Sequence, residues 1–108
     1  MSDLIAVTTA CPTLDEAERI AAVLLSTHMV AGVLIDQVRS RYHWAGEIHG
    51  RDEWRLRAWS RRTLASLLQA KIREEHSYEV FEFVMSPLEP GTGPFADWVR
   101  ETVPAHAV

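Results

Sequence analysis

Cysteine is nearly absent from this chain of 108 residues, in which Cys11 is the only thiol. One cysteine excludes a disulfide within the chain and is compatible with a reducing compartment. No apolar run approaches the length needed to span a bilayer, and the first residues lack the basic and apolar regions of a signal peptide. We therefore expect a cytoplasmic protein without a membrane partner.

Motifs that would nominate a reaction are missing as well. The sequence contains no P-loop, no GxGxxG and no Ser–His–Asp grouping, and its histidines and cysteine fit no HxH, CxxC or HExxH spacing. The aromatic signature of an RNA-recognition domain is also missing, and the net charge of −4 weakly disfavours nucleic acid. We predict a non-enzymatic protein with no nucleic-acid partner and no required cofactor.

The composition is that of an ordinary soluble domain. Apolar residues make up 47% of the chain and charged residues 24%, and this length suffices for a single two-layer core. Neither an internal repeat nor a linker divides the sequence, so we predict one domain over residues 1–108.

Local patterns predict four strands, two helices between them and a third helix at the end. Strands are expected at Leu4–Thr9, Val30–Trp44, Trp54–Trp59 and Tyr78–Met85. Helices are expected from Thr13 to His28, from Ser60 or Thr63 to Ile72, and from Pro94 to Thr102, after a loop that contains Pro87, Pro90, Gly91 and Gly93. This βαββαβ order with a C-terminal helix predicts a ferredoxin-like α+β sandwich.

The first two helices carry further local signals. Thr13 and Glu16 have the spacing of a capping box, in which the hydroxyl and the carboxylate each accept the other residue's free backbone amide. Apolar residues then recur on one face of each helix. They are Ala17, Ile20, Ala21 and Leu24 in the first helix, with His28 on the same face, and Leu64, Leu67, Leu68 and Ile72 in the second.

The second and third strands form a hairpin that is longer than usual. Ala45 to Glu47 is the predicted tight turn, because Gly46 accepts a positive φ. Strands this long would overhang a core of this size, and the exposed aromatic residues would need another surface to cover them. We therefore predict an oligomer, with Tyr42, Trp44 and Trp54 as packing residues of the hairpin.

His76 and Glu82 are the candidate metal ligands, since imidazole and carboxylate suit borderline divalent cations. Alternation along the predicted strand places Tyr78 and Glu82 on one face and Glu79 on the other, so Glu79 and Glu82 are not a paired acid–base device. Two ligands do not make a strong site, so another segment or subunit would have to complete it. The alternative is that His76 ends a helix and Glu82 pairs with an arginine.

Positive charge is concentrated in the middle of the chain, where seven arginines lie between Arg39 and Arg62. Guanidinium groups suit bidentate and interfacial pairing. One interpretation is an anion-binding surface, and the other is an amphipathic strand that exposes one side to water. The candidate anion-binding residues are Arg39, Arg41, Arg55 and Arg57.

Three segments resemble the CutA divalent-cation tolerance family. Residues 42–48 resemble its Tyr-x-Trp-x-Gly-Lys-Ile turn, and residues 76–82 resemble its His-Pro-Tyr-x-x-Pro-Glu segment. Residues 87–98 are similar to its Pro-Val…Gly…Tyr-x-x-Trp ending, and looser matches at 15–17 and 30–33 precede them in the same order. Each motif is weak, but together they cover nearly the whole chain.

This resemblance implies a homotrimer whose hairpins pack across subunits, with a role in divalent-cation tolerance. Carried over position by position, it implies His76 and Glu82 as ligands for weakly bound Cu(II) or Zn(II). CutA-like trimers also resemble the PII signalling proteins in fold, whose ligands lie between subunits. The alternative is therefore a PII-like signalling module whose intersubunit cleft binds a small anion or a partner protein.

The chain departs from the family pattern at several positions. Gly32 stands where the family usually has a cysteine, and Ser77 and Phe81 replace both prolines of the His-Pro-Tyr segment. The thiol that some members place at the end of the first strand aligns with Thr9 rather than with Cys11. The resemblance therefore identifies a divergent member.

Overall fold

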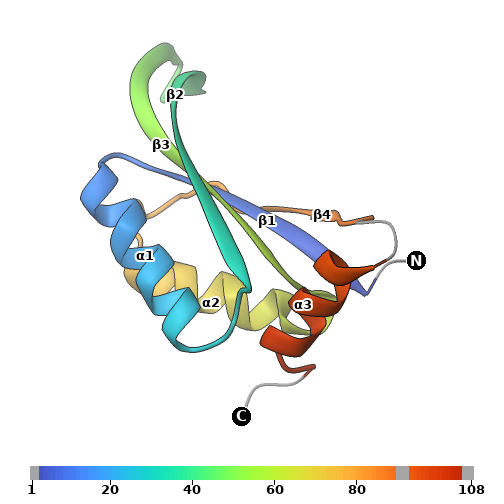
Figure 1. The fold of residues 1–108 in the computed structure, drawn as a ribbon. Coiled ribbons are helices and arrows are strands. Elements are labelled where there is room, and N and C mark those ends of the chain that lie inside the picture. Colours follow the sequence, from blue (N-terminus) through green and yellow to red (C-terminus); the bar gives the residue numbers. More distant parts are fainter. Residues whose placement is uncertain (1–2, 90–92, 106–108) are drawn as a thin grey trace.

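The computed structural model describes residues 3–89 and 93–105, and its element order confirms the predicted βαββαβ plan with a terminal helix (Figure 1). The elements are β1 (Leu4–Cys11), α1 (Leu14–Ser26), β2 (Gly32–Trp44), β3 (Glu47–Arg61), the short 3-10 helix η1 (Arg62–Leu64), α2 (Ala65–Glu75), β4 (Val84–Pro87) and α3 (Pro94–Thr102). All three strand pairs are antiparallel, in the order β2-β3-β1-β4. Pro90 and Gly91 of the predicted loop lie outside the described residues.

Helices α1 and α2 cover one face of the sheet. Ala58 on that face pairs with Val7 of β1 and with Val33 of β2. Against it α1 buries the apolar residues of its predicted face, including Ile20 and Leu24, which are 0% exposed, whereas His28, predicted on the same face, is exposed. The stripe of α2 is buried as predicted, except for Leu67, which is 44% exposed. Periodicity therefore located this part of the core.

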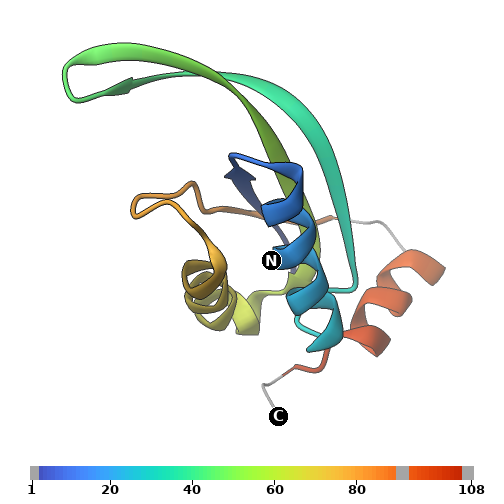
Figure 2. The same ribbon diagram turned by 90° about the vertical axis from the view of Figure 1, so that its left-hand side faces the viewer.

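Helix α3 lies on the opposite side of the sheet from α1 and α2, near the beginning of β2 (Figure 2). Its Phe95 ring meets Trp59 of β3 edge to face at 6.2 Å. A Cβ atom at Gly32 would lie 3.1 Å from the Trp98 ring and 3.3 Å from Trp59. The absence of a side chain at Gly32 therefore lets this helix pack closely on the sheet.

The β2–β3 hairpin extends well beyond the other strands, as predicted (Figures 1 and 2). Its pairing runs from Gly32 opposite Trp59 to Trp44 opposite Glu47, whereas β1 accompanies it only as far as Trp54. The turn places Ala45 at φ 52° and Gly46 at φ 79°. Near the tip, Trp44 is 56% exposed, so a large apolar ring remains uncovered within the subunit.

The fourth strand is present, but its predicted bounds, Tyr78–Met85, are wrong, because β4 covers only Val84–Pro87. Two backbone donors before it are taken by side chains: Ser77 N–H donates to the Glu16 carboxylate, and Tyr78 N–H donates to the His76 ring. Of the predicted strand, the amide of Tyr78 is therefore not available to a ladder. Glu79 and Glu82 both precede β4, so the predicted placement of these residues on opposite faces of a strand is wrong as well.

The predicted cap of the second helix is also wrong. Leu64 is the residue before α2, and no side chain caps it. Ser60 instead lies in β3 and donates its hydroxyl hydrogen to Met29 O at 2.7 Å, while the Thr63 hydroxyl donates to Ala105 O. Both hydroxyls bond to distant segments, which the local sequence could not reveal. No helix in the described part of the chain is long and apolar enough to cross a membrane.

Candidate metal centre

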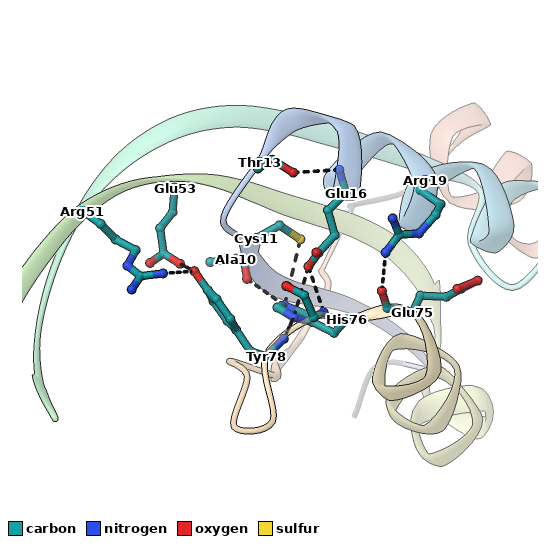
Figure 3. A network of polar contacts seen from close by, with 11 residues as sticks. Ala10, Cys11, Thr13, Glu16, Arg19, Arg51, Glu53, Glu75, His76 and Tyr78 are labelled. Atoms are coloured by element: carbon teal, nitrogen blue, oxygen red, sulfur yellow. Dashed lines mark hydrogen bonds and ion pairs between the residues drawn. The ribbon is translucent and has the colours of Figure 1, made fainter. Parts of the chain in front are cut away.

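Three buried side chains of metal-ligand type converge where β1, α1 and α2 meet (Figure 3). Cys11 is the last residue of β1, Glu16 lies in the first turn of α1, and His76 follows the last residue of α2. They are 0%, 6% and 9% exposed, and one ligand atom from each lies within 4.8 Å of the others. We refer to these three residues as the joint cluster.

Both ring nitrogens of His76 are engaged. Nε2 lies 2.8 Å from Ala10 O, and because a carbonyl only accepts, Nε2 carries the proton. Nδ1 accepts the Tyr78 backbone N–H at 3.1 Å. The ring also stacks on Phe81, with centroids 5.0 Å apart and planes at 21°. These contacts fix the orientation of the imidazole.

Glu16 fulfils only half of its predicted capping box. The Thr13 hydroxyl accepts the Glu16 backbone N–H at 3.2 Å, as predicted. The Glu16 carboxylate does not accept the Thr13 backbone amide. Its Oε2 atom instead accepts Ser77 N–H at 3.2 Å and lies 3.3 Å from His76 Nδ1. The side chain therefore links the start of α1 to the end of α2.

Cys11 is a buried thiol beside this pair, with Sγ 4.0 Å from His76 Nε2. Burial, together with the negative charges of Glu16 and Glu53, raises its pKa to about 12. The group is therefore a neutral thiol at physiological pH. A thiophilic cation would have to displace its proton.

A second network connects the joint cluster to the hairpin. The Tyr78 hydroxyl accepts from Arg51 Nη1 at 2.8 Å and donates to Glu53 Oε2 at 2.9 Å (Figure 3). The Arg51 guanidinium also lies 5.5 Å from the Tyr78 ring and 6.0 Å from that of Tyr42. Burial and the neighbouring Glu53 carboxylate raise the pKa of Tyr78 to about 12, so the phenol keeps its proton.

The structure separates the two ligands predicted from the sequence. His76 belongs to the buried joint cluster, whereas Glu82 is exposed and lines an open groove of about 730 Å³ under the hairpin, where Arg55 attracts it electrostatically. Cys11 and Glu16 take the places beside His76. The sequence did not predict these two residues as ligands, because both are far from His76 along the chain. The capping-box spacing of Glu16 also suggested a different role for its carboxylate.

The four candidate anion-binding arginines do not converge. Arg55 forms a bidentate pair with Asp36, at 3.0 and 2.8 Å, and Arg39 pairs with Asp52 at 3.3 Å. Arg57 lies over the Trp59 ring, 5.3 Å from its centroid. Arg41 lines the groove under the hairpin, which also contains Arg51. The pairs follow the hairpin register, as an amphipathic strand would arrange them.

The three predicted packing residues lie in different surroundings. Trp44 is exposed near the hairpin tip, and Tyr42 stacks on His49 across the two strands, with centroids 5.8 Å apart. Trp54 packs against the subunit's own core. Two of the three therefore lie on the part of the hairpin that extends beyond β1.

The donor types of the joint cluster fit a borderline cation. A thiol, an imidazole and a carboxylate are the groups that bind Zn(II) and copper. Tetrahedral zinc bonds place neighbouring ligand atoms roughly 3.3–3.7 Å apart, and His76 Nδ1 and Glu16 Oε2 are already 3.3 Å apart. The whole set spans up to 4.8 Å, so its ligand atoms would need to draw together by about 1 Å.

Known proteins share this sequence pattern. The profile of the family described as CutA1 divalent ion tolerance protein matches residues 5–102. The divalent-cation tolerance protein CutA of Archaeoglobus fulgidus is 34% identical over 92 residues, which cover 85% of this chain and 90% of that protein. Protein CutA of Bos taurus is 31% identical over 91 residues, or 84% of this chain and 52% of its own length. The chain thus spans about half the length of such mammalian relatives.

Solved structures share the fold as well. A structure described as the periplasmic divalent cation tolerance protein CutA from Archaeoglobus fulgidus superimposes with a TM-score of 0.90 at 31% identity, covering 94% of this chain and 99% of that one. The divalent cation tolerance protein from Thermus thermophilus gives 0.89 at 27% identity, covering 94% and 99%. The similarity therefore extends over nearly the whole subunit.

Proposed function

This chain belongs to the CutA1 divalent ion tolerance protein family, and on that premise we propose that it is a non-enzymatic, cytoplasmic homotrimer that binds a divalent cation weakly near His76. The observation that carries this proposal is the burial of His76 among groups of metal-ligand type. Imidazole favours Cu(II) and Zn(II) over hard cations such as Mg(II), so binding of those two ions is the expected basis of a role in cation tolerance.

Calorimetric titration of the metal-free protein tests this proposal. Cu(II) and Zn(II) are expected to bind, and Mg(II) and Ca(II), which prefer oxygen ligands, are the matched controls. A His76→Ala, Glu82→Ala double variant should lose the Cu(II) and Zn(II) heats. Isotherms of wild type and double variant that coincide would remove the site from the proposal.

The hairpin supports the trimer. Trp44 and Ile48 are 56% and 64% exposed near its tip, and apolar side chains of this size gain free energy when a second surface buries them. Native mass spectrometry is expected to show three subunits for the wild type. A Trp44→Glu variant should shift the distribution towards smaller species, whereas a monomeric wild type would contradict the assembly.

A PII-like module that binds an anion or a partner loop is the second candidate. Arg41 and Arg51 line the groove under the hairpin and favour it, while Glu53, Glu79 and Glu82 line the same groove and oppose it. A thermal-shift screen with nucleotides and small carboxylates separates the two functions. Stabilisation by an anion that an Arg41→Ala variant abolishes would favour the module.

A further inference from the structure

A second cavity lies at the opposite end of α1 from the joint cluster. It has a volume of about 600 Å³ and is bounded by the turn after α1, by one side of α2 and by the end of α3. The joint cluster takes Glu16 from the first turn of α1, whereas His28, which lines this cavity, follows the last turn. Because α1 has 13 residues, the two sites are roughly 20 Å apart along the helix. We call this cavity the helix cleft.

The wall that α2 contributes to the helix cleft is apolar at one end and charged at the other. Leu67 is 44% exposed, although the predicted stripe placed it in the core, and it lines the cleft together with Met29 and Pro104. One turn further along α2, roughly 6 Å away, Lys71 Nζ donates to Glu74 Oε2 at 3.1 Å. A ligand that lies along this wall must therefore carry its charges at one end and an apolar group at the other.

The ion pair in this wall keeps bonding capacity on both of its members. Lys71 Nζ has three donor hydrogens, of which Glu74 takes one, and the Glu74 carboxylate has further lone pairs. The two side chains are 34% and 66% exposed, so their pairing in water stabilises the protein little. A carboxylate beside Lys71 and an ammonium group beside Glu74 would complete both members. A small molecule that carries these two charges together is a zwitterion.

His28 lines the cleft from the turn after α1, in an unusual backbone conformation. Its φ is 57°, in the left-handed region where glycine or asparagine usually follows a helix, and strained residues of this kind gather at ligand sites. The ring is tied to the end of α3, with Nδ1 3.2 Å from Thr102 O. A carbonyl only accepts, so Nδ1 is the donor, and in the neutral ring Nε2 keeps its lone pair. That lone pair is a further acceptor for an ammonium group.

From these contacts we propose that the helix cleft binds a free amino acid with an apolar side chain. The carboxylate of the ligand pairs with Lys71, and its ammonium group pairs with Glu74 and His28 Nε2. The apolar side chain lies on Leu67 and Met29, where its removal from water contributes to affinity. This activity goes beyond the proposed cation binding, and neither of the two depends on the other.

Calorimetric titration of the full chain with free leucine tests the class of ligand. Two matched analogues separate its charges, because isocaproate lacks the ammonium group and isoamylamine lacks the carboxylate. Leucine is expected to bind more tightly than either analogue by roughly tenfold or more. Equal affinities for the three compounds, or no binding of leucine, would overturn the proposal whatever the metal titrations show.

Three variants and one measurement on the wild type locate the ligand. Lys71→Gln and Glu74→Gln should each weaken leucine binding roughly tenfold, and unchanged binding by both would overturn the proposal. His28→Asn should also weaken binding, since asparagine tolerates the left-handed backbone but lacks the ring. Glu75→Gln, which alters a neighbouring carboxylate outside the cleft, should bind like wild type. In the wild type, leucine should shift the amide NMR signals of residues 27–29, and shifts confined to the groove under the hairpin would contradict the site.

Discussion

The joint cluster and the hairpin tip both carry many polar side chains, but they use them differently. At the joint, Cys11, Glu16 and His76 come from three elements and are almost fully buried. Along the hairpin, pairs such as Arg39–Asp52 join facing strands, and both side chains are more than half exposed. Electrostatic interactions are strong in the first environment and screened in the second. The joint is therefore suited to ligand chemistry and the tip to contact with other surfaces.

The largest expected difference between the regions concerns their histidines. His76→Ala would remove the stack on Phe81 and leave Ala10 O and Tyr78 N–H without their partner. We expect a loss of about 2–4 kcal/mol in the free energy of unfolding. Denaturant titration of metal-free protein at one fixed protein concentration measures it.

His49→Ala is the matched control near the hairpin tip, where the ring stacks on Tyr42. Its loss should stay within about 1 kcal/mol. Equal losses for the two variants would show that the joint is no more constrained than the tip.

The tyrosines provide the next contrast. Tyr78→Phe would remove the hydroxyl between Arg51 and Glu53, and Glu53 is 7% exposed. The variant is expected to lose about 1–2 kcal/mol. Tyr42→Phe, close to the same arginine, should change stability by less than about 0.5 kcal/mol. The same denaturation measurement compares them, and a larger loss for Tyr42→Phe would reverse the proposed order.

The smallest effect is expected at the exposed pair of Asp36 and Arg55. The Arg55 guanidinium lowers the pKa of Asp36 below its ordinary value of 3.8. Because the folded-state pKa is the lower one, the pair stabilises the protein at neutral pH, and this contribution is lost as the pH falls through the lowered pKa.

Asp36→Asn should therefore slightly reduce the thermal midpoint at pH 7, and this reduction should shrink as the pH falls below 3.8. High salt should shrink even the difference at pH 7. A difference that persists in high salt would mean that the pair is less accessible to solvent than its position indicates.

The fold was largely predictable because its signals are local. The Ile20 and Leu24 stripe, the Thr13 cap and the Gly46 turn each depend on residues within a few positions of one another. The composition of residues 78–85, rich in Val and Phe, also predicted a strand. There the predicted bounds failed: the strand begins only at Val84, and the Tyr78 amide donates to the His76 ring instead of to a ladder.

The candidate site was only partly predictable for the same physical reason. His76 could be identified from its own segment, because the motif around it resembles a known one. Its partners Cys11 and Glu16 are 65 and 60 positions away, and only the packing of α1 beside α2 brings them together. Glu82 was predicted as the second ligand because it belongs to the same short segment as His76. In the structure it lies before β4 and lines the groove under the hairpin.

X-ray absorption spectroscopy of the Zn(II)-loaded protein tests the central claim most directly, because it reports the atoms bonded to the ion. We predict one sulfur ligand at about 2.3 Å together with nitrogen and oxygen at about 2.0–2.2 Å, and loss of the sulfur signal in Cys11→Ser. A spectrum of the wild type with only nitrogen and oxygen around zinc would contradict the joint cluster as the cation site.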